Sequence, residues 1–151
     1  MKKTFVFLGL IFFTFLSCEK DDFCTQNPIT PNLILRFYDA SDREAVKTVD
    51  NLYVWAEGKD SLFVNASLDS LFIPLNTANT ETVYNFSKNN VVNQFTIQYT
   101  PNNEYVSRSC GYKVVFSDVT FSSDNTWITD FEPKTLTSIE NQNEAHVQIF
   151  H

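Results

Sequence analysis

Few side chains in this sequence are spaced for catalysis. His146 and His151 lie five residues apart in an alternating C-terminal segment, so they should face opposite sides of a strand and cannot bind one metal ion together. No Gly-x-Ser-x-Gly motif is present. Acidic pairs such as Asp39 and Asp130 are common in any acidic β-protein. We therefore expect no catalytic residues, no metal site and no cofactor. A small enzyme whose catalytic triad comes from residues distant in the sequence is kept as a further hypothesis.

Cys18 carries the clearest chemical signal. Before it come two lysines, an apolar run over residues 5–16 and the small residue Ser17. This pattern resembles a bacterial lipoprotein signal, in which a peptidase cuts before the cysteine and the thiol is acylated. Ordinary signal peptidase cleavage near Ser17 is the alternative. With three acyl chains, at about 0.8 kcal/mol per buried CH₂, the anchor would be effectively permanent.

The residues after Cys18 bear on location. The run Glu19–Asp22 is Glu-Lys-Asp-Asp, which resembles the export signal that sends Bacteroidota lipoproteins to the outer cell surface. A plain hydrophilic tether is the alternative. We expect a lipoprotein of the outer membrane, exposed at the cell surface, with the periplasmic face as the alternative. The predicted division is a signal peptide at 1–17, a lipidated tether at 18–31 and a folded domain at 32–151.

Two further cysteines, Cys24 and Cys110, are left once Cys18 is assigned to the lipid. They are an even number in a compartment that permits disulfides, so we expect a Cys24–Cys110 bond. Two unpaired thiols are the alternative. A thiol redox site is not expected, because the sequence has no Cys-x-x-Cys pair.

Net charge restricts the partners. The formal charge is −7, and loss of Lys2 and Lys3 with the signal would make it −9. A domain this acidic will not bind nucleic acid through the phosphate backbone, and it repels anionic lipid surfaces. We therefore expect attachment to the membrane through the lipid anchor alone.

Composition and periodicity predict an all-β protein. The chain has 15 Phe and 6 Tyr but only 3 Gly, and aromatic side chains suit a pleated surface. Apolar residues alternate in short runs with turn residues between them, which predicts eight to ten strands at a spacing typical of sandwiches. We expect one domain, an antiparallel two-sheet β-sandwich of immunoglobulin-like type, with a β-barrel as the alternative.

Three local features sharpen this prediction. An inward row is expected at Leu62, Val64 and Ala66. Thr100–Glu104 contains Pro-Asn-Asn, which predicts a turn. The apolar alternation slips by one residue at Ser117–Asp118, which predicts a β-bulge.

Tyr53 and Trp55 form the most specific binding hypothesis. If Leu52, Val54 and Ala56 face the core, the two rings point outward from one strand. Adjacent exposed rings on a β-sandwich are how many sugar-binding modules stack on pyranose faces. The alternative is that the strand is covered on both sides and that Trp55 is a packed residue.

Ser61 and Ser70 are candidates for modification. Asp60-Ser61-Leu62 and Asp69-Ser70-Leu71 both resemble the acceptor tripeptide of Bacteroidota protein O-glycosylation. A chance match at the start of a strand is the alternative, because an acidic chain rich in serine produces such tripeptides readily.

Four stretches together resemble a family of small uncharacterised flavobacterial lipoproteins. They are Cys24, Pro31–Asp39, Tyr105–Lys113 and Ala145–His151. The resemblance spans most of the mature chain and implies an envelope location, but it carries no known activity. We expect a non-catalytic binding or accessory module that docks on an envelope protein complex. The alternative is a carbohydrate-binding component of a surface polysaccharide uptake system.

Overall fold

The structure is a computed structural model that describes residues 23–24 and 28–151. The predicted signal peptide, the Cys18 lipid site and most of the predicted tether lie outside the described residues. The chain divides into two compact units. One combines residues up to Pro28 with Tyr105–Tyr112, and the other combines Ile29–Glu104 with Lys113–His151. In the part that is described, no helix is long and apolar enough to cross a bilayer.

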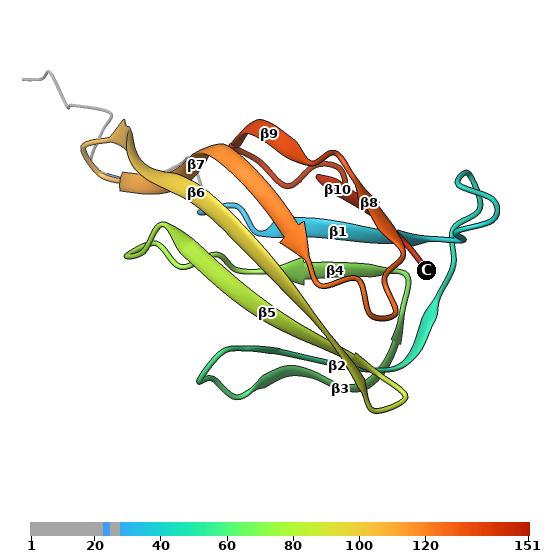
Figure 1. Cartoon of the computed structure of the whole chain (residues 1–151). Coiled ribbons are helices and arrows are strands. Elements are labelled where there is room, and N and C mark those ends of the chain that lie inside the picture. The colour runs from blue at the N-terminus through green and yellow to red at the C-terminus, as the bar shows by residue number, and fades with distance from the viewer. Residues whose placement is uncertain (1–22, 25–27) are drawn as a thin grey trace, which may run out of the picture. The chain divides into compact units, whose positions relative to one another are not determined.

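Ten strands make up the regular structure of the described residues (Figure 1). The first five are β1 Leu33–Tyr38, β2 Val49–Ala56, β3 Ser61–Leu68, β4 Ser70–Ile73 and β5 Glu81–Lys88. The last five are β6 Val91–Ser107, β7 Gly111–Ser123, β8 Asp130–Glu132, β9 Thr135–Ile139 and β10 Val147–Phe150.

The strands form two separate sheets. One has four strands in the order β4-β1-β10-β8, and the other has six in the order β3-β2-β5-β6-β7-β9. The predicted two-sheet β-sandwich is confirmed, and the alternative of a closed barrel is not what the described strands form. The pair β1–β10 is parallel, with Leu35 opposite Val147, whereas β1–β4 and β10–β8 are antiparallel. This pair joins the start and the end of the larger unit.

The core of the larger unit consists of the inward rows of both sheets, as alternation requires. Its members are fully or almost fully buried. The largest of them with under 2% exposure include Phe37, Phe86, Phe95, Phe116, Leu35, Leu52 and Ile97. Aromatic residues therefore supply much of the buried volume, as the composition indicated.

Two tight turns follow from residues that tolerate positive φ. Asn89 and Asn90, with φ values of 50° and 65°, join β5 to β6 directly, since Lys88 pairs with Val91. Positive φ at both central residues is typical of a type I′ hairpin, whose twist matches that of the strands. Gly58, with φ of 68°, lies in the turn between β2 and β3.

The predicted inward row of β3 is wrong at Leu62 and Val64 but right at Ala66, which lies opposite the buried Leu52. Leu62 and Val64 are 46% and 65% exposed, and Phe63 packs against the core instead. Both phases of this segment offer apolar residues, so alternation alone could not choose between them. The pairing with β2 decides, because Phe63 lies opposite the buried Val54, and directly paired residues share a face. Asn65, with φ of 50°, lies where the register shifts between the Val54–Phe63 and Leu52–Ala66 pairs, and β3 continues beyond it.

The predicted turn at Thr100–Glu104 is also wrong, because β6 runs through it without a break. The Asn102 side-chain amide donates to the carbonyl of Thr100 and, at 2.9 Å, to Oγ of Ser117 in β7. Pairing of β6 with β7 over a long hairpin thus overrides a local turn preference. By contrast, the slip predicted at Ser117–Asp118 is present: Phe116 and Val119 both face the core, and Asp118 has φ of 52°.

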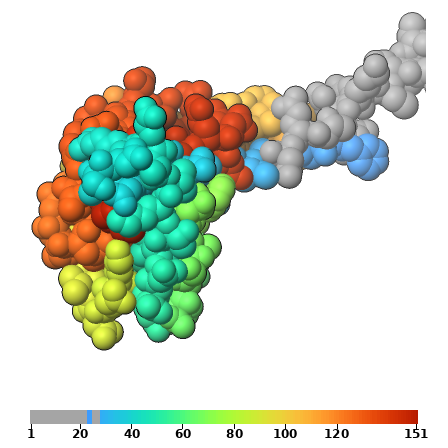
Figure 2. All heavy atoms as spheres, turned by 90° about the vertical axis from the view of Figure 1, so that its right-hand side faces the viewer, coloured from blue at the N-terminus to red at the C-terminus, as the bar shows by residue number. Residues whose placement is uncertain are grey.

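The loop after β1 is held against β8 by charge. Arg43 donates to Asp130 at 2.6 Å and also to Glu132, and its guanidinium lies over the Phe150 ring. Figure 2 looks onto this side of the larger unit, where the cyan segment that carries Arg43 lies near the orange and red strands. Hydrogen bonds from Lys134 and then Arg43 lower the pKa of Asp130 to about 2. These side chains are partly exposed, so we treat the contact as positioning the loop rather than as a major source of stability.

Candidate functional site

Tyr53 and Trp55 lie on the outward face of β2, as predicted. Leu52 and Val54 are fully buried, so the residues that alternate with them face away from the core. Tyr53 is 38% exposed and Trp55 is partly exposed. The larger unit therefore leaves this face of β2 partly open to solvent and does not cover the strand on both faces.

Neighbouring strands extend this face. The register places Ser87 of β5 opposite Tyr53, and Val92 of β6 opposite Ser87. Val92 is 41% exposed whereas Ser87 is only 8% exposed. On the other side, Leu62 and Val64 of β3 share the outward face because Phe63 between them faces inward. We define the outer patch as Tyr53, Trp55, Leu62, Val64 and Val92.

The outer patch also has polar neighbours that can form hydrogen bonds. Asn85 of β5 is opposite Trp55, and Gln94 of β6 is opposite Asn85. Both residues alternate with buried ones, so their amides share the outward face. Each amide offers one acceptor oxygen and two N–H donors. The arrangement is therefore one aromatic ring, Trp55, in line with two amides, and a second ring, Tyr53, beside it on the same face.

A hollow of about 560 Å³ is lined in part by Ala56 and Glu57, which follow Trp55 in the chain. It is lined by the β2–β3 turn, the chain after β4 and the start of β5: Ala56, Glu57, Lys59, Pro74, Leu75, Asn76, Thr77, Asn79, Glu81, Thr82, Val83 and Tyr84. Among these lining residues, the Tyr84 hydroxyl donates to the carbonyl of Pro74 at 2.6 Å. Burial, followed by repulsion from Tyr99, raises the pKa of Tyr84 to about 12. This hydroxyl thus stays protonated and acts as a structural donor.

The two histidines have structural partners. His146 Nδ1 accepts the N–H of Ile34 at 2.9 Å, and its Nε2 lies 2.9 Å from the carbonyl of Asn141. His151 Nδ1 lies 3.0 Å from the Lys88 ammonium, and its ring packs edge-on against Phe37. The two imidazoles flank β10 at either end and bind different groups.

Acidification is expected to lower the melting temperature by several degrees between about pH 7.5 and pH 5. Burial lowers the pKa of His146, and burial together with Lys88 lowers the pKa of His151. In the unfolded chain both titrate near their usual value, about 6.5, so the unfolded state binds more protons. Their stabilising contribution is complete above that value and is lost as the pH falls below it. Thermal unfolding at a series of pH values measures this. His146→Gln should flatten the profile, and a melting temperature that is constant or rises on acidification would contradict the assignment.

The predicted glycosylation residues both lie at strand starts. Ser61 is exposed at the start of β3, and Ser70 begins β4, where its hydroxyl donates to Asp69 at 2.8 Å. The outer patch is close to the first of them, because Ser61 pairs with Trp55. Modification of either serine stays a prediction.

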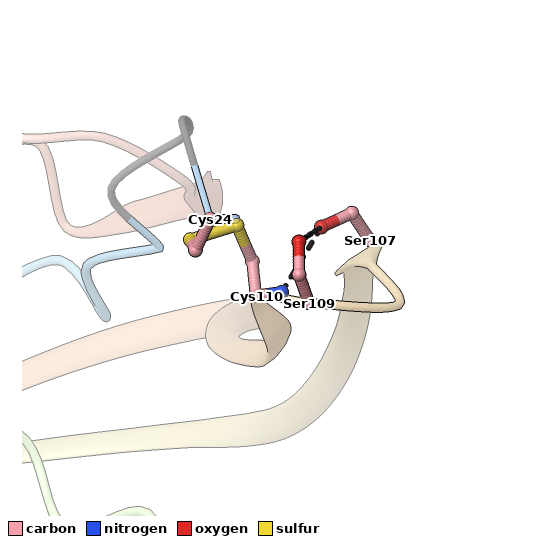
Figure 3. The surroundings of a disulfide bond; sticks show 4 residues. All are labelled: Cys24, Ser107, Ser109 and Cys110. Carbon is pink, nitrogen blue, oxygen red and sulfur yellow. Dashed lines mark hydrogen bonds between the residues drawn. A yellow bond between two sulfur atoms is a disulfide. The ribbon is translucent and has the colours of Figure 1, made fainter. Parts of the chain in front are cut away.

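The smaller unit holds the predicted disulfide. Cys24 and Cys110 are bonded, with their Cα atoms 4.8 Å apart (Figure 3). The Cys110 N–H donates to Oγ of Ser107 at 3.0 Å, which shapes the turn between β6 and β7. Tyr105 and Tyr112 face each other across this hairpin end, edge to face, with ring centroids 5.3 Å apart.

Sequence reasoning missed several of these residues. Leu62 and Val64 were assigned inward, and only the pairing of Phe63 with Val54 corrects them. Tyr105 and Tyr112 received no role, although each lies a few residues from the turn that contains Cys110, a symmetry that could have indicated a hairpin pair.

Comparison with known proteins gives one finding. Residues 51–151 match the model of a family of unknown function, DUF6452. No curated protein and no solved structure matches the chain. The matched range contains the outer patch and Cys110 but not Cys24.

Proposed function

Because the chain belongs to the DUF6452 family of unknown function, we propose from its own residues that it is a cell-envelope lipoprotein with a non-catalytic binding or accessory module. The module is the β-sandwich, and its binding surface is the outer patch. The partner of this surface is an envelope protein complex, with a glycan as the alternative.

Support for the location comes from the N-terminal sequence. The apolar run, Ser17 and Cys18 have the order of a lipoprotein signal, and Glu19–Asp22 resembles a surface export signal of Bacteroidota. The proposed location is therefore the outer face of the outer membrane, and the resemblance to flavobacterial lipoproteins supports an envelope location. The periplasmic face is the alternative.

The observation that carries the binding role is the exposure of the outer patch. Tyr53, Leu62, Val64 and Val92 are each between 38% and 65% exposed on one sheet face. The first three lie on the adjacent strands β2 and β3, and Val92 lies on β6, beyond Ser87 of β5. Single exposed apolar residues need no explanation, but a contiguous group of them is typical of an interaction site. Aromatic residues at the centre of such a group supply most of the binding free energy in known interfaces.

A specific observation favours the glycan alternative. Trp55 is in register with the amide residues Asn85 and Gln94, and Tyr53 lies two residues away on the same face of β2. Rings that stack on the apolar face of a sugar, next to groups that bond to its hydroxyls, are the two components that carbohydrate recognition requires. This alternative makes the protein the sugar-binding component of a polysaccharide uptake system.

Trp55→Ala tests the outer patch. If the patch binds glycans, the purified domain will bind members of a glycan array, and the variant will bind at least roughly tenfold more weakly. Phe72→Ala is the matched control, because Phe72 is 52% exposed on β4 of the other sheet. Unchanged binding in Trp55→Ala would reject the platform.

A photo-crosslinking residue tests the accessory role when no glycan binds. Placed at position 53 in living cells, it should capture a defined envelope protein, whereas the same residue at position 72 should not. Equal capture at both positions would argue against a specific docking face.

A further inference from the structure

The disulfide restricts where the end of the β6–β7 hairpin can lie relative to the lipid. This step rests on the proposed acylation of Cys18. Cys24 follows Cys18 by six residues, which span at most about 20 Å when fully extended. Cys24 is bonded to Cys110, and their Cα atoms are 4.8 Å apart. Whatever path the tether takes, Cys110 therefore stays close to the acylated thiol.

Without the bond, the restriction would be looser. The next residue after Cys24 with a hydrogen bond to a distant segment is Thr30, whose Oγ1 accepts the N–H of Val114 at 3.0 Å. Thr30 is twelve residues after Cys18, a span of up to about 40 Å. The Cys24–Cys110 bond thus halves the number of residues between the lipid and the first fixed point of the chain. A short tether also raises the effective concentration of that surface at the membrane.

The surface held there is aromatic. We define the hairpin tip as Phe23 together with Tyr105–Tyr112. Phe23 is 82% exposed, Tyr105 is 58% exposed and Tyr112 is 65% exposed. The two tyrosine rings brace each other edge to face at 5.3 Å, which leaves their outer surfaces available for contact. Three large rings exposed to solvent within one small unit are typical of an interaction site.

The chemistry of these side chains matches a lipid interface. Tyrosine is enriched at the boundary between water and acyl chains, because its ring is apolar and its hydroxyl can stay hydrated. Phenylalanine can enter the outermost acyl layer. The run Glu19–Asp22 beside the lipid has a net charge of −2, which does not favour an electrostatic contact with anionic headgroups, and Arg108 is the one basic residue of the hairpin tip. We therefore assign most of the attraction to the rings.

We propose that the hairpin tip is a second membrane contact of this protein, in which Phe23, Tyr105 and Tyr112 insert at the lipid interface next to the acylated Cys18. The disulfide is the element that holds the tip there. The contact defines which end of the β6–β7 hairpin faces the lipid.

Quenching of a tryptophan placed in the tip tests this proposal. Full-length acylated protein carrying Tyr112→Trp is reconstituted in phosphatidylethanolamine vesicles with or without brominated acyl chains. Emission of the parent protein, which contains Trp55 and Trp127, is subtracted. The added emission should be blue-shifted and largely lost in the brominated vesicles. If the added emission keeps its intensity in brominated vesicles and is still quenched by acrylamide from the water, the contact is overturned. A tip that docks on a protein, and not on lipid, would also stay unquenched in vesicles that contain no other protein.

The matched variant combines Tyr112→Trp with Cys24→Ser and Cys110→Ser. This variant keeps the lipid on Cys18 but no longer ties the hairpin tip to it. The emission of the added tryptophan should therefore be as strong in brominated vesicles as in vesicles without bromine. Quenching that persists in this variant would contradict the role of the disulfide. Circular dichroism checks that the sandwich is folded in each variant.

Intact mass and vesicle flotation separate this proposal from the one on which it rests. Protein that carries acyl groups and floats, but shows no quenching, overturns the tip contact and leaves the lipoprotein assignment standing. Protein from native membranes with an unmodified Cys18 overturns both.

Discussion

Phe95→Ala is expected to lower the free energy of unfolding by about 3–5 kcal/mol. Phe95 is fully buried in β6, and its ring lies 5.8 Å from Phe86, 5.9 Å from Phe121 and 5.2 Å from Phe131. Phe131 belongs to β8 of the other sheet, so this ring connects the two layers. Truncation removes the buried area and leaves a cavity that rigid neighbours cannot close.

Urea unfolding of the two proteins measures this effect as a shift of the midpoint at constant slope. Phe72→Ala is the control, since Phe72 is the same residue type at 52% exposure, and it should change the stability by less than about 0.5 kcal/mol. Equal losses for the two variants would show that the Phe95 cluster is not the centre of the core.

Loss of the Cys24–Cys110 bond is the second large effect, expected to cost about 2–4 kcal/mol. The two cysteines are 86 residues apart, and the chain-entropy model gives about 4–5 kcal/mol for closing a loop of that length in the unfolded state. Reduction also releases the segment around Cys24 in the folded protein, which returns some entropy to that state. The net cost should therefore fall below the value from loop closure alone.

Unfolding of the Cys24→Ser, Cys110→Ser double variant measures this cost, and the oxidised and reduced parent provide a second comparison. Addition of the reductant to the double variant is the control, because it should leave the unfolding midpoint unchanged when the bond is absent. A double variant as stable as the oxidised parent would mean that the unfolded chain is already compact around these positions.

Much of the fold could be predicted because the relevant information is local. Alternation in β1, β2, β5 and β6 identified the inward residues Leu35, Val54, Phe86 and Phe95, which are all fully buried. The bonded pair Cys24 and Cys110 followed from the cysteine count once Cys18 was assigned to the predicted lipid site. The outward direction of Tyr53 and Trp55 followed from their neighbours in the same strand.

The remaining features depend on contacts between distant segments. In β3, apolar residues occupy both phases, and only the pairing of Phe63 with Val54 turned Leu62 and Val64 outward. At Pro101 the local preference for a turn lost to pairing along the β6–β7 hairpin. In both places the decisive hydrogen bonds and side-chain contacts come from another strand, which a local pattern does not contain.

The sequence by itself determined that this protein is built of strands, which residues of most strands face the core, and which two cysteines are bonded. Only the tertiary structure decided that Leu62, Val64 and Val92 join Tyr53 and Trp55 in one outward patch, and that β1 lies parallel to β10. The reason is physical. A strand's two faces are set by the two-residue period of its own backbone, whereas the neighbours on each face are set by register and strand order, which depend on packing of the whole unit.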